Sequence, residues 1–235
     1  VPQDYKEAVR LFRLSAEQGD AGAQTNLGWM YQKGLGGIPQ DYQEALKWYR
    51  LSAEQGRAEG QFNLGFMYEY GKGVPQDDKE AGRLYRLSAE QGYAKAQTNL
   101  GVMYAKGDGV PQDYKEAAKW LRLSAEQGNA KAQFNLGVMY DKGQGVPQDY
   151  KEAVRLYRLS AEQGDADAQN NLGLMYAKGQ GVLQDFALAH MWFNLSGSNG
   201  SKEAVENRNI VEKIMTPSQI EEAQRMARNW KPTKK

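Results

Sequence analysis

The sequence contains no cysteine and a single histidine, His190, among its 235 residues. Without cysteine the chain can form neither disulfides nor thiolate nucleophiles nor zinc–sulfur sites. A Ser–His–acid arrangement would depend on His190, which we expect to be an ordinary surface or packing residue. No spacing typical of metal ligands and no unusual carboxylate cluster occurs. We therefore expect no catalytic residue, no metal site and no cofactor.

Long apolar runs and an excess of one charge are missing as well. No stretch approaches the roughly 18 apolar residues that a membrane helix requires. Lys and Arg total 30 against 29 for Asp and Glu, so nucleic acid, which needs a clustered positive surface, is not an expected partner. The sequence begins at Val1 inside a repeat, so we expect upstream residues in the natural protein. The compartment therefore cannot be read from these residues.

The chain is rich in one internal repeat of 36 residues. The copy at 110–145 reads VPQDYKEAAKWLRLSAEQGNAKAQFNLGVMYDKGQG. Other copies span 1–36, 38–73, 74–109 and 146–181, and a degenerate sixth copy spans 182–204. A fixed period of this length indicates a stacked array of equivalent supersecondary units. We expect one elongated solenoid domain over residues 1–235.

Each copy is predicted to form two helices. In 110–145 the first begins at the N-cap Asp113, with Glu116 closing a capping box, and Gly128 forms its left-handed C-terminal cap. The second runs from Asn129 to Gly143. Two antiparallel helices joined by short turns are the unit of an all-α solenoid. The Gly-x-Gly between copies follows a helix instead of opening one, which favours caps and turns over a phosphate loop.

Two further features recur in every full copy, and a third position alternates between leucine and tryptophan. A glycine in the middle of the second helix, which costs about 1 kcal/mol relative to alanine, predicts a close approach to a small residue of a first helix. Arginine and glutamate four residues apart predict a solvated ladder of weak ion pairs. Trp48, Trp120 and Trp192 share one position with leucines and are expected in the core. The glycines are Gly28, Gly65, Gly101, Gly137 and Gly173, and their expected partners are Ala8, Ala45, Ala81, Ala117 and Ala153. The expected ion pairs are Arg13 with Glu17, Arg50 with Glu54, Arg86 with Glu90, Arg122 with Glu126 and Arg158 with Glu162.

A long motif connects the chain to a known family. The string Ala-x-Ala-Gln-x-Asn-Leu-Gly-x-Met-Tyr-x-x-Gly-x-Gly-Val-Pro-Gln-Asp-Tyr-x-x-Ala, followed by Ser-Ala-Glu-Gln-Gly, resembles the Sel-one-like repeat, a relative of the tetratricopeptide repeats. The resemblance covers Val1 to about Ala204, with departures at Gly60, Asp78 and Leu183. It implies a right-handed superhelix of antiparallel helices, a scaffold role in protein assembly, and a concave face lined by the Asn-Leu-Gly helices. It also favours an exported bacterial protein, periplasmic or secreted, over a cytoplasmic one.

The two ends of the array differ from its middle. Residues 202–230 are predicted to form capping helices, one of them opened by a capping box at Thr216 and Gln219. Its apolar face, which includes Ala227 and Trp230, is expected to cover the last repeat. The first helix, Asp4–Gln18, has no preceding helix to pack on. Its apolar face is expected to be covered by another chain, through self-association, or by upstream sequence.

Positions that vary while the repeat framework stays constant are the candidates for binding. In the second helices they are the equivalents of Gly22, Thr25, Trp29 and Gln32, which share one helical face beside a recurring asparagine. We expect this face to hold a protein or peptide in the concave groove through aromatic anchors and amides. Alternatively, the asparagines bridge helices, and Phe62 and Phe134 pack between repeats. The candidates are Asn26, Trp29, Phe62, Asn63, Phe66, Glu69, Asn99, Val102, Phe134, Asn135, Val138, Asn171 and Leu174.

These observations predict a non-enzymatic scaffold that binds a protein or peptide. The alternative is a small-molecule or cell-wall-related binder or hydrolase, since cysteine-rich members of the resembling family are associated with β-lactam binding. The missing cysteines argue against that branch, and the net charge of +1 argues against RNA binding. The identity of the partner does not follow from the sequence.

Overall fold

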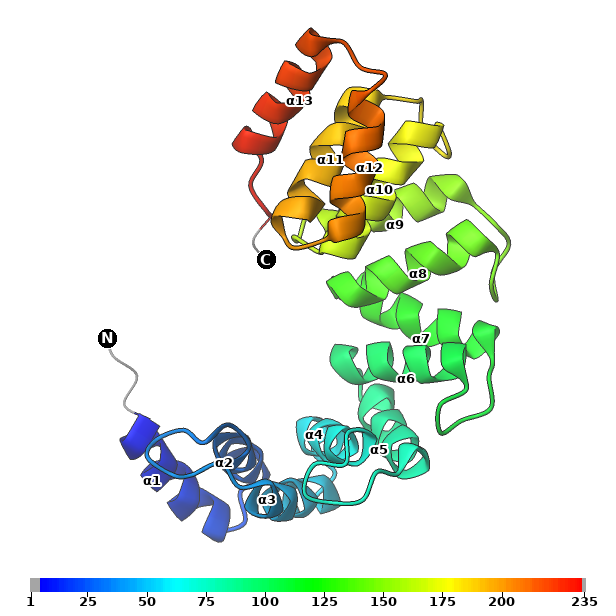
Figure 1. The fold of residues 1–235 in the computed structure, drawn as a ribbon. Helices are drawn as coiled ribbons and strands as arrows, with labels where there is room; N and C mark the ends of the chain where they lie inside the picture. The colour runs from blue at the N-terminus through cyan, green and yellow to red at the C-terminus, as the bar shows by residue number, and fades with distance from the viewer. Residues whose placement is uncertain (1–4, 234–235) are drawn as a thin grey trace. The chain divides into compact units, whose positions relative to one another are not determined.

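The computed structural model describes residues 5–233, and within this range it contains thirteen α-helices and no strand (Figure 1). The all-α repeat fold predicted from the period is therefore confirmed. In chain order the helices are α1 (Tyr5–Glu17), α2 (Ala21–Lys33), α3 (Tyr42–Glu54), α4 (Ala58–Glu69), α5 (Asp78–Glu90), α6 (Ala94–Lys106), α7 (Tyr114–Glu126), α8 (Ala130–Lys142), α9 (Tyr150–Ala161), α10 (Ala166–Lys178), α11 (Phe186–Ser198), α12 (Lys202–Glu212) and α13 (Pro217–Asn229).

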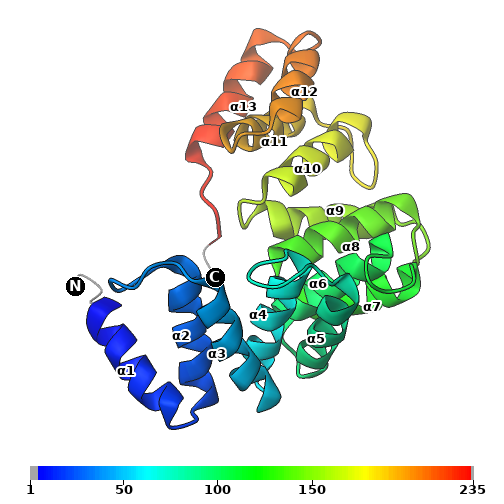
Figure 2. The ribbon, with the colours of Figure 1, turned by 60° about the horizontal axis from the view of Figure 1, so that its bottom comes forward.

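The helices form two compact units, residues 1–113 and residues 114–235. Within a unit, each second helix packs against the first helix of its own repeat and against the first helix of the next one. Helix α2, for example, contacts both α1 and α3 (Figure 2), and α10 contacts both α9 and α11. Because the second helices are covered on two sides, they bury more of their circumference than a one-sided surface helix does. A single domain spanning both units stays a prediction.

The start of the first helices is held by a contact that crosses between helices. The N-cap Asp77 accepts a hydrogen bond from the Glu80 backbone N–H, while its own N–H donates to the Tyr68 carbonyl oxygen at 3.0 Å. In a capping box, the N-cap backbone N–H would instead donate to the side chain of the glutamate three residues on. The Glu80 side chain instead pairs with Arg83 at 2.7 Å.

Asp113 shows the same arrangement as Asp77. Its N–H donates to the Tyr104 carbonyl oxygen at 2.9 Å, and Glu116 pairs with Lys119 at 3.3 Å, while the capping box of Asp113 and Glu116 stays a prediction. The N-cap position itself is predicted correctly, since α7 begins at the next residue.

The arginines of the first helices do not form the predicted ladder with glutamates four residues on. Arg122 donates to the Tyr140 hydroxyl at 2.9 Å and Arg158 to the Tyr176 hydroxyl at 2.6 Å, each tyrosine lying on the second helix of the same repeat. A charged donor placed on a tyrosine hydroxyl ties the two helices of a hairpin together. The prediction of an exposed Arg–Glu ladder is therefore wrong.

The recurring glycines follow the prediction in part. The glycines between repeats adopt positive φ, as at Gly143 (φ 67°) and Gly145 (φ 70°), which confirms their role as caps and turns. Four of the mid-helix glycines, Gly28, Gly65, Gly137 and Gly173, lie against the following first helix, where the nearest neighbour is an aromatic ring and not an alanine side chain. A Cβ on Gly137 would stand 2.9 Å from two ring carbons of Tyr157. The Tyr157 ring occupies the space that a Cβ at position 137 would need, so close packing requires glycine there.

Serine and glutamine of the Ser-Ala-Glu-Gln-Gly ending bind buried backbone and side-chain groups across repeats. Ser88 donates to the Ala58 carbonyl at 2.7 Å, and Gln91 donates to the Gln61 side chain at 2.7 Å. Gln97 in turn donates to the Ala89 carbonyl at 3.1 Å. Because these groups lie at or near the interior, their pairing avoids the cost of unsatisfied polar atoms.

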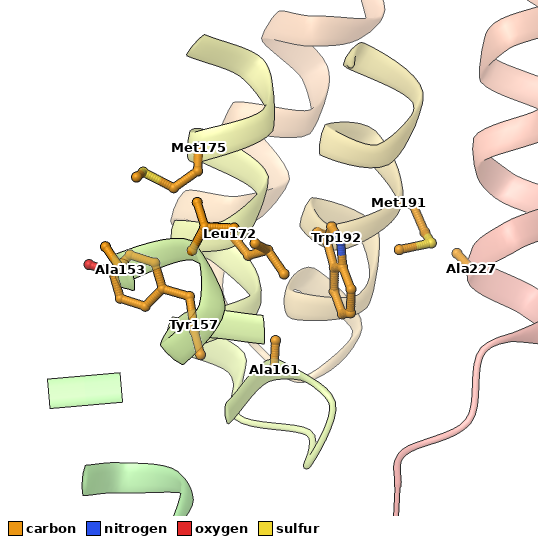
Figure 3. Close-up of a cluster of buried hydrophobic side chains, with 10 residues drawn as sticks. Ala153, Tyr157, Ala161, Leu172, Met175, Met191, Trp192 and Ala227 are labelled. Atoms are coloured by element: carbon orange, nitrogen blue, oxygen red, sulfur yellow. The ribbon is translucent and has the colours of Figure 1, made fainter. Parts of the chain in front are cut away.

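Trp48, Trp120 and Trp192 are buried, as predicted. The equivalent residue of α1, Leu11, is instead 51% exposed, and α1 is the first helix of the described residues 5–233. At the other end, α12 and α13 pack on α11, and the predicted capping box of Thr216 and Gln219 is confirmed. Figure 3 shows Trp192 and the neighbouring Met191 between α10 and Ala227 of α13.

No helix within residues 5–233 is long and apolar enough to cross a membrane. Over the same range, no group of three or more His, Asp or Glu side chains is arranged to hold a metal ion.

Candidate functional site

The second helices α2 and α4 of the first unit touch each other and carry exposed aromatic side chains. Trp29 on α2 is 41% exposed. Its counterpart on α4, Phe66, is half-buried and lies 4.5 Å, centroid to centroid, from the ring of Tyr70 at the end of that helix. Tyr70 is itself 54% exposed. Three large rings therefore stand at or near the surface of two contacting helices.

The asparagines beside this face have different surroundings. Asn26 is exposed and Asn63 is half-buried. Asn99 and Asn171 each act to lower the pKa of a tyrosine on the first helix of the same repeat, Tyr85 and Tyr157 respectively. Asn135 is half-buried. Bridging between helices by these asparagines stays a prediction.

The position of Phe62 and Phe134 faces the following repeat. The Phe62 ring lies 5.5 Å from the Tyr85 ring and 5.2 Å from the Tyr93 ring, and the Phe134 ring lies 6.0 Å from the Tyr157 ring. Packing between repeats is therefore confirmed for both phenylalanines. Whether they also contact a partner stays a prediction.

The last variable position of each second helix is matched to one residue of the following first helix. Gln32 accepts from the Tyr49 hydroxyl at 2.7 Å, Glu69 from the Tyr85 hydroxyl at 2.5 Å and Asp141 from the Tyr157 hydroxyl at 3.3 Å. Where the first helix has Phe193 in place of tyrosine, the position is Ala177, and both belong to one apolar cluster. The sequence repeats this match at Ala105 and Leu121. The variation at this position is thus explained by internal pairing.

Burial strengthens these tyrosine contacts. Burial first, and then the Glu69 carboxylate, raises the pKa of Tyr85 above its ordinary value. Burial and then the Asp141 carboxylate likewise raise the pKa of Tyr157. Both phenols therefore stay protonated at physiological pH and act as hydrogen-bond donors. Glu69 belongs to the candidate binding residues, but its carboxylate already accepts a hydrogen bond from Tyr85 of the same chain.

The remaining candidates are apolar and only partly accessible. Val138 packs against the core cluster of the second unit, and Leu174 packs against the cluster around Phe193. Val102 in the first unit is half-buried. The exposed aromatic surface is therefore found on α2 and α4, and the equivalent positions of the second unit carry aliphatic side chains.

Sequence reasoning missed Tyr70 and Tyr93. Both stand at positions that hold no aromatic residue in the other full copies: Tyr70 replaces lysine, and Tyr93 replaces aspartate, asparagine or arginine. The signal was present as a departure from the repeat. Both residues lie at helix ends, outside the variable face of the second helices.

His190 is a packing residue in this structure. It is buried, and its Nε2 lies 2.7 Å from the Glu212 carboxylate of α12. The contact holds α11 and α12 together, and no nucleophile is paired with it among the hydrogen bonds of the described residues.

Comparison with known proteins identifies the repeat. The family model described as Sel1 repeat matches residues 1–20, 21–56, 58–93, 94–129, 130–165 and 166–201. Comparison with curated protein sequences found no match.

Two solved structures are similar over 98% of this chain. One is c5321, a protective antigen present in uropathogenic Escherichia coli strains displaying an SLR fold, with 40% identity and a TM-score of 0.91. The chain covers 49% of that antigen, about half of its length. The other is a Sel1 repeat protein from Oxalobacter formigenes, with 35% identity, a TM-score of 0.82 and 94% of that chain covered.

A third structure is more distant. The immunity protein Pa5087 from Pseudomonas aeruginosa is 23% identical, has a TM-score of 0.54, and is matched over 84% of this chain and 75% of its own. At this identity the likeness shows the fold alone. The six matched repeats and the two closer structures show that this chain belongs to the Sel1 repeat family.

Proposed function

We propose that this protein is a scaffold whose α2–α4 face, formed by Trp29, Phe66 and Tyr70, binds a segment of a partner protein. Sel1 repeat proteins are generally protein-interaction scaffolds, which supports the general role. The observation that carries the finer proposal is the exposure of Trp29 (41%) and Tyr70 (54%) on contacting helices. Grouped exposed rings mark interaction surfaces far more often than single exposed residues do.

The chemistry of the face suits an extended peptide with apolar side chains. Aromatic rings bury large areas with few rotatable bonds, so they anchor a partner at low entropic cost. Asn26, exposed beside Trp29, offers an amide that can both donate to and accept from a peptide backbone. Gln32 and Glu69 at the edge already accept hydrogen bonds from tyrosines and contribute less.

The test uses the partner captured by affinity purification with the intact chain. Trp29→Ala and Phe66→Ala are each expected to weaken binding about tenfold or more, as truncation of a central aromatic anchor does. Leu183→Ala is the matched control, because Leu183 is 91% exposed in the loop between α10 and α11 of the second unit. Unchanged affinity for both aromatic variants, with circular dichroism showing an intact fold, would place the interface elsewhere.

We also propose that the chain self-associates through α1. Leu11 and Leu14 are 51% and 47% exposed, whereas the counterparts of Leu11 on the other first helices are buried. Exposed leucines on one helix face are a common start for helix pairing. Leu11→Glu is expected to shift sedimentation equilibrium toward monomer. A wild-type chain that is monomeric at about 100 μM, well above a micromolar dissociation constant, would refute this proposal.

A further inference from the structure

Each unit contains a recess between two successive first helices. In the first unit it lies between α3 and α5 and has a volume of about 330 Å³; in the second it lies between α7 and α9 and measures about 430 Å³. The two recesses are lined by equivalent side chains of the repeat. The floor combines leucines of the enclosed second helix and of the next first helix, Leu64 and Leu84 in one unit and Leu136 and Leu156 in the other.

The corresponding place between α9 and α11 is filled by the C-terminal segment of the chain itself. Trp192, the counterpart of Leu156, meets the Trp230 ring edge-on, with centroids 6.2 Å apart and planes at 73°. The Thr233 N–H donates to the Glu162 carbonyl at 2.7 Å, and Glu162 is the counterpart of the wall residue Glu126. Ala227 of α13 lies opposite Met191 and Trp192 (Figure 3).

The filled and open places differ at the rim. Next to α13 the rim side chains are Leu188 and Met191, which pack on the same cluster as Trp230. The open recess of the second unit has Glu152 and Arg155 at these positions, paired at 2.6 Å. Because the open rim is charged and the floor apolar, a suitable occupant has an apolar anchor and a polar flank.

The open recesses also keep an apolar side chain at the surface. Leu87 and Leu159, which line them, are 36% and 37% exposed. Their counterpart in the filled place, Leu195, packs against the cluster that contains Ala227. This leucine position is thus covered where the C-terminal segment packs on it, and it is partly exposed in the two open recesses.

From this comparison we propose that the α3–α5 and α7–α9 recesses dock helical segments of a partner protein. The occupant is a short amphipathic helix with an alanine and methionine edge that ends in tryptophan, the chemistry of Met226, Ala227 and Trp230. Its tryptophan lies on the leucine floor, its next backbone N–H groups reach the carbonyl at the end of the first helix, and its charged side chains face the Glu–Arg rim. This surface is separate from the α2–α4 face, so its success or failure is independent of the function proposed above.

A peptide with the sequence of residues 217–235 is the probe. Titrated at fixed label concentration against the full chain, it is expected to bind saturably, as measured by fluorescence anisotropy. The double variant Leu87→Glu/Leu159→Glu is expected to weaken binding about tenfold or more, since a carboxylate then faces the tryptophan. The same peptide with alanine in place of Trp230 is expected not to bind. Leu183→Glu is the matched control, and Trp29→Ala is expected to have no effect.

Three results would overturn the proposal. One is the lack of saturable binding at about 1 mM peptide, the weak limit of useful affinity. Another is binding that survives the double variant, which means that the peptide displaces the chain's own α13. The third is loss of binding in Trp29→Ala, which assigns the peptide to the α2–α4 face.

A trapping experiment gives an independent location. The chain has no cysteine, so Leu159→Cys provides a single thiol at the α7–α9 recess. A peptide that keeps Trp230 and carries cysteine in place of the neighbouring Lys231 is expected to form a mixed disulfide with this variant in a buffer of reduced and oxidised glutathione. Leu183→Cys, more exposed and equally reactive toward a free thiol probe, is expected to trap far less peptide. Equal trapping by both variants would contradict docking at the recess.

Discussion

Replacing Gly137 by alanine tests the packing of a tyrosine ring on the mid-helix glycine. Alanine favours a helix interior by about 1 kcal/mol over glycine. The added Cβ, however, would stand 2.9 Å from both Cδ1 and Cε1 of Tyr157. These atoms must separate by about 0.5 Å or more to reach ordinary van der Waals contact. Overpacking of this kind typically costs about 1–3 kcal/mol.

The tyrosine has little freedom to move away. Tyr157 is fully buried, its hydroxyl donates to Asp141 at 3.3 Å, and the Phe134 ring lies 6.0 Å from its own. The overpacking cost is therefore expected to exceed the helix-propensity gain. Gly137→Ala should lower the free energy of unfolding by up to about 2 kcal/mol, the difference between the two terms.

Gly22→Ala is the matched control for this prediction. A Cβ on Gly22 meets only the Asp20 side chain at 3.3 Å and the Arg57 side chain at 3.6 Å and beyond. Other copies carry Glu59 and Lys95 at this position. Gly22→Ala is therefore expected to leave stability unchanged or raise it by up to about 1 kcal/mol.

Urea unfolding measures the free energy of unfolding of both variants, which can be compared directly if the denaturant slope m is unchanged. Amide hydrogen exchange in α8 and α9 reports the local effect even if the repeats do not unfold in one step. A Gly137→Ala variant as stable as Gly22→Ala would refute the packing argument.

Three other substitutions test single contacts. Tyr85→Phe leaves Glu69 without its phenol donor and should cost about 1–2 kcal/mol; adding Glu69→Ala should recover most of this in a double-mutant cycle, whereas additive losses would contradict the pairing. Trp230→Ala should destabilise the docking of α13 by about 3 kcal/mol and raise amide exchange there, so unchanged protection of α13 would contradict its role. Burial raises the pKa of Asp165, so its ionised form is disfavoured in the folded chain, while asparagine caps equally well. Asp165→Asn is therefore expected to raise thermal stability slightly at pH 7, and the gain should vanish as pH falls below that pKa, where Asp165 is itself neutral; a gain that persists at low pH would contradict the desolvation argument.

Local sequence signals predicted the helices well because their boundaries depend on local chemistry. Asp113 before α7 and Gly143 after α8 mark ends by capping, which a few neighbouring residues decide. The direction of the charged side chains depends on partners in other helices. Glu80 turns to Arg83 because the Tyr68 carbonyl already occupies the N-cap N–H, and no spacing within one helix reveals that contact.

The candidate site was predicted less completely, for a related reason. Variability among repeats has two sources, contact with a partner and contact with a variable neighbour inside the chain. Trp29 is exposed, which is consistent with the first source, whereas Glu69 pairs with Tyr85, which is the second. Comparing each second helix with the following first helix, instead of only with other second helices, would have revealed that pairing from the sequence.

The matched tyrosines have a consequence for how such genes rearrange. Recombination between near-identical repeats can add or delete a whole unit. A crossover between Glu69 and Tyr85, or between equivalent residues of other repeats, separates the two members of a matched pair. The product then places an acidic residue opposite a leucine such as Leu121, or an alanine opposite a buried tyrosine. A crossover between Tyr85 and Ala105 instead transfers every donor with its own acceptor. Inherited duplications in this family should therefore have their breakpoints clustered within hairpins and not at the junctions between them.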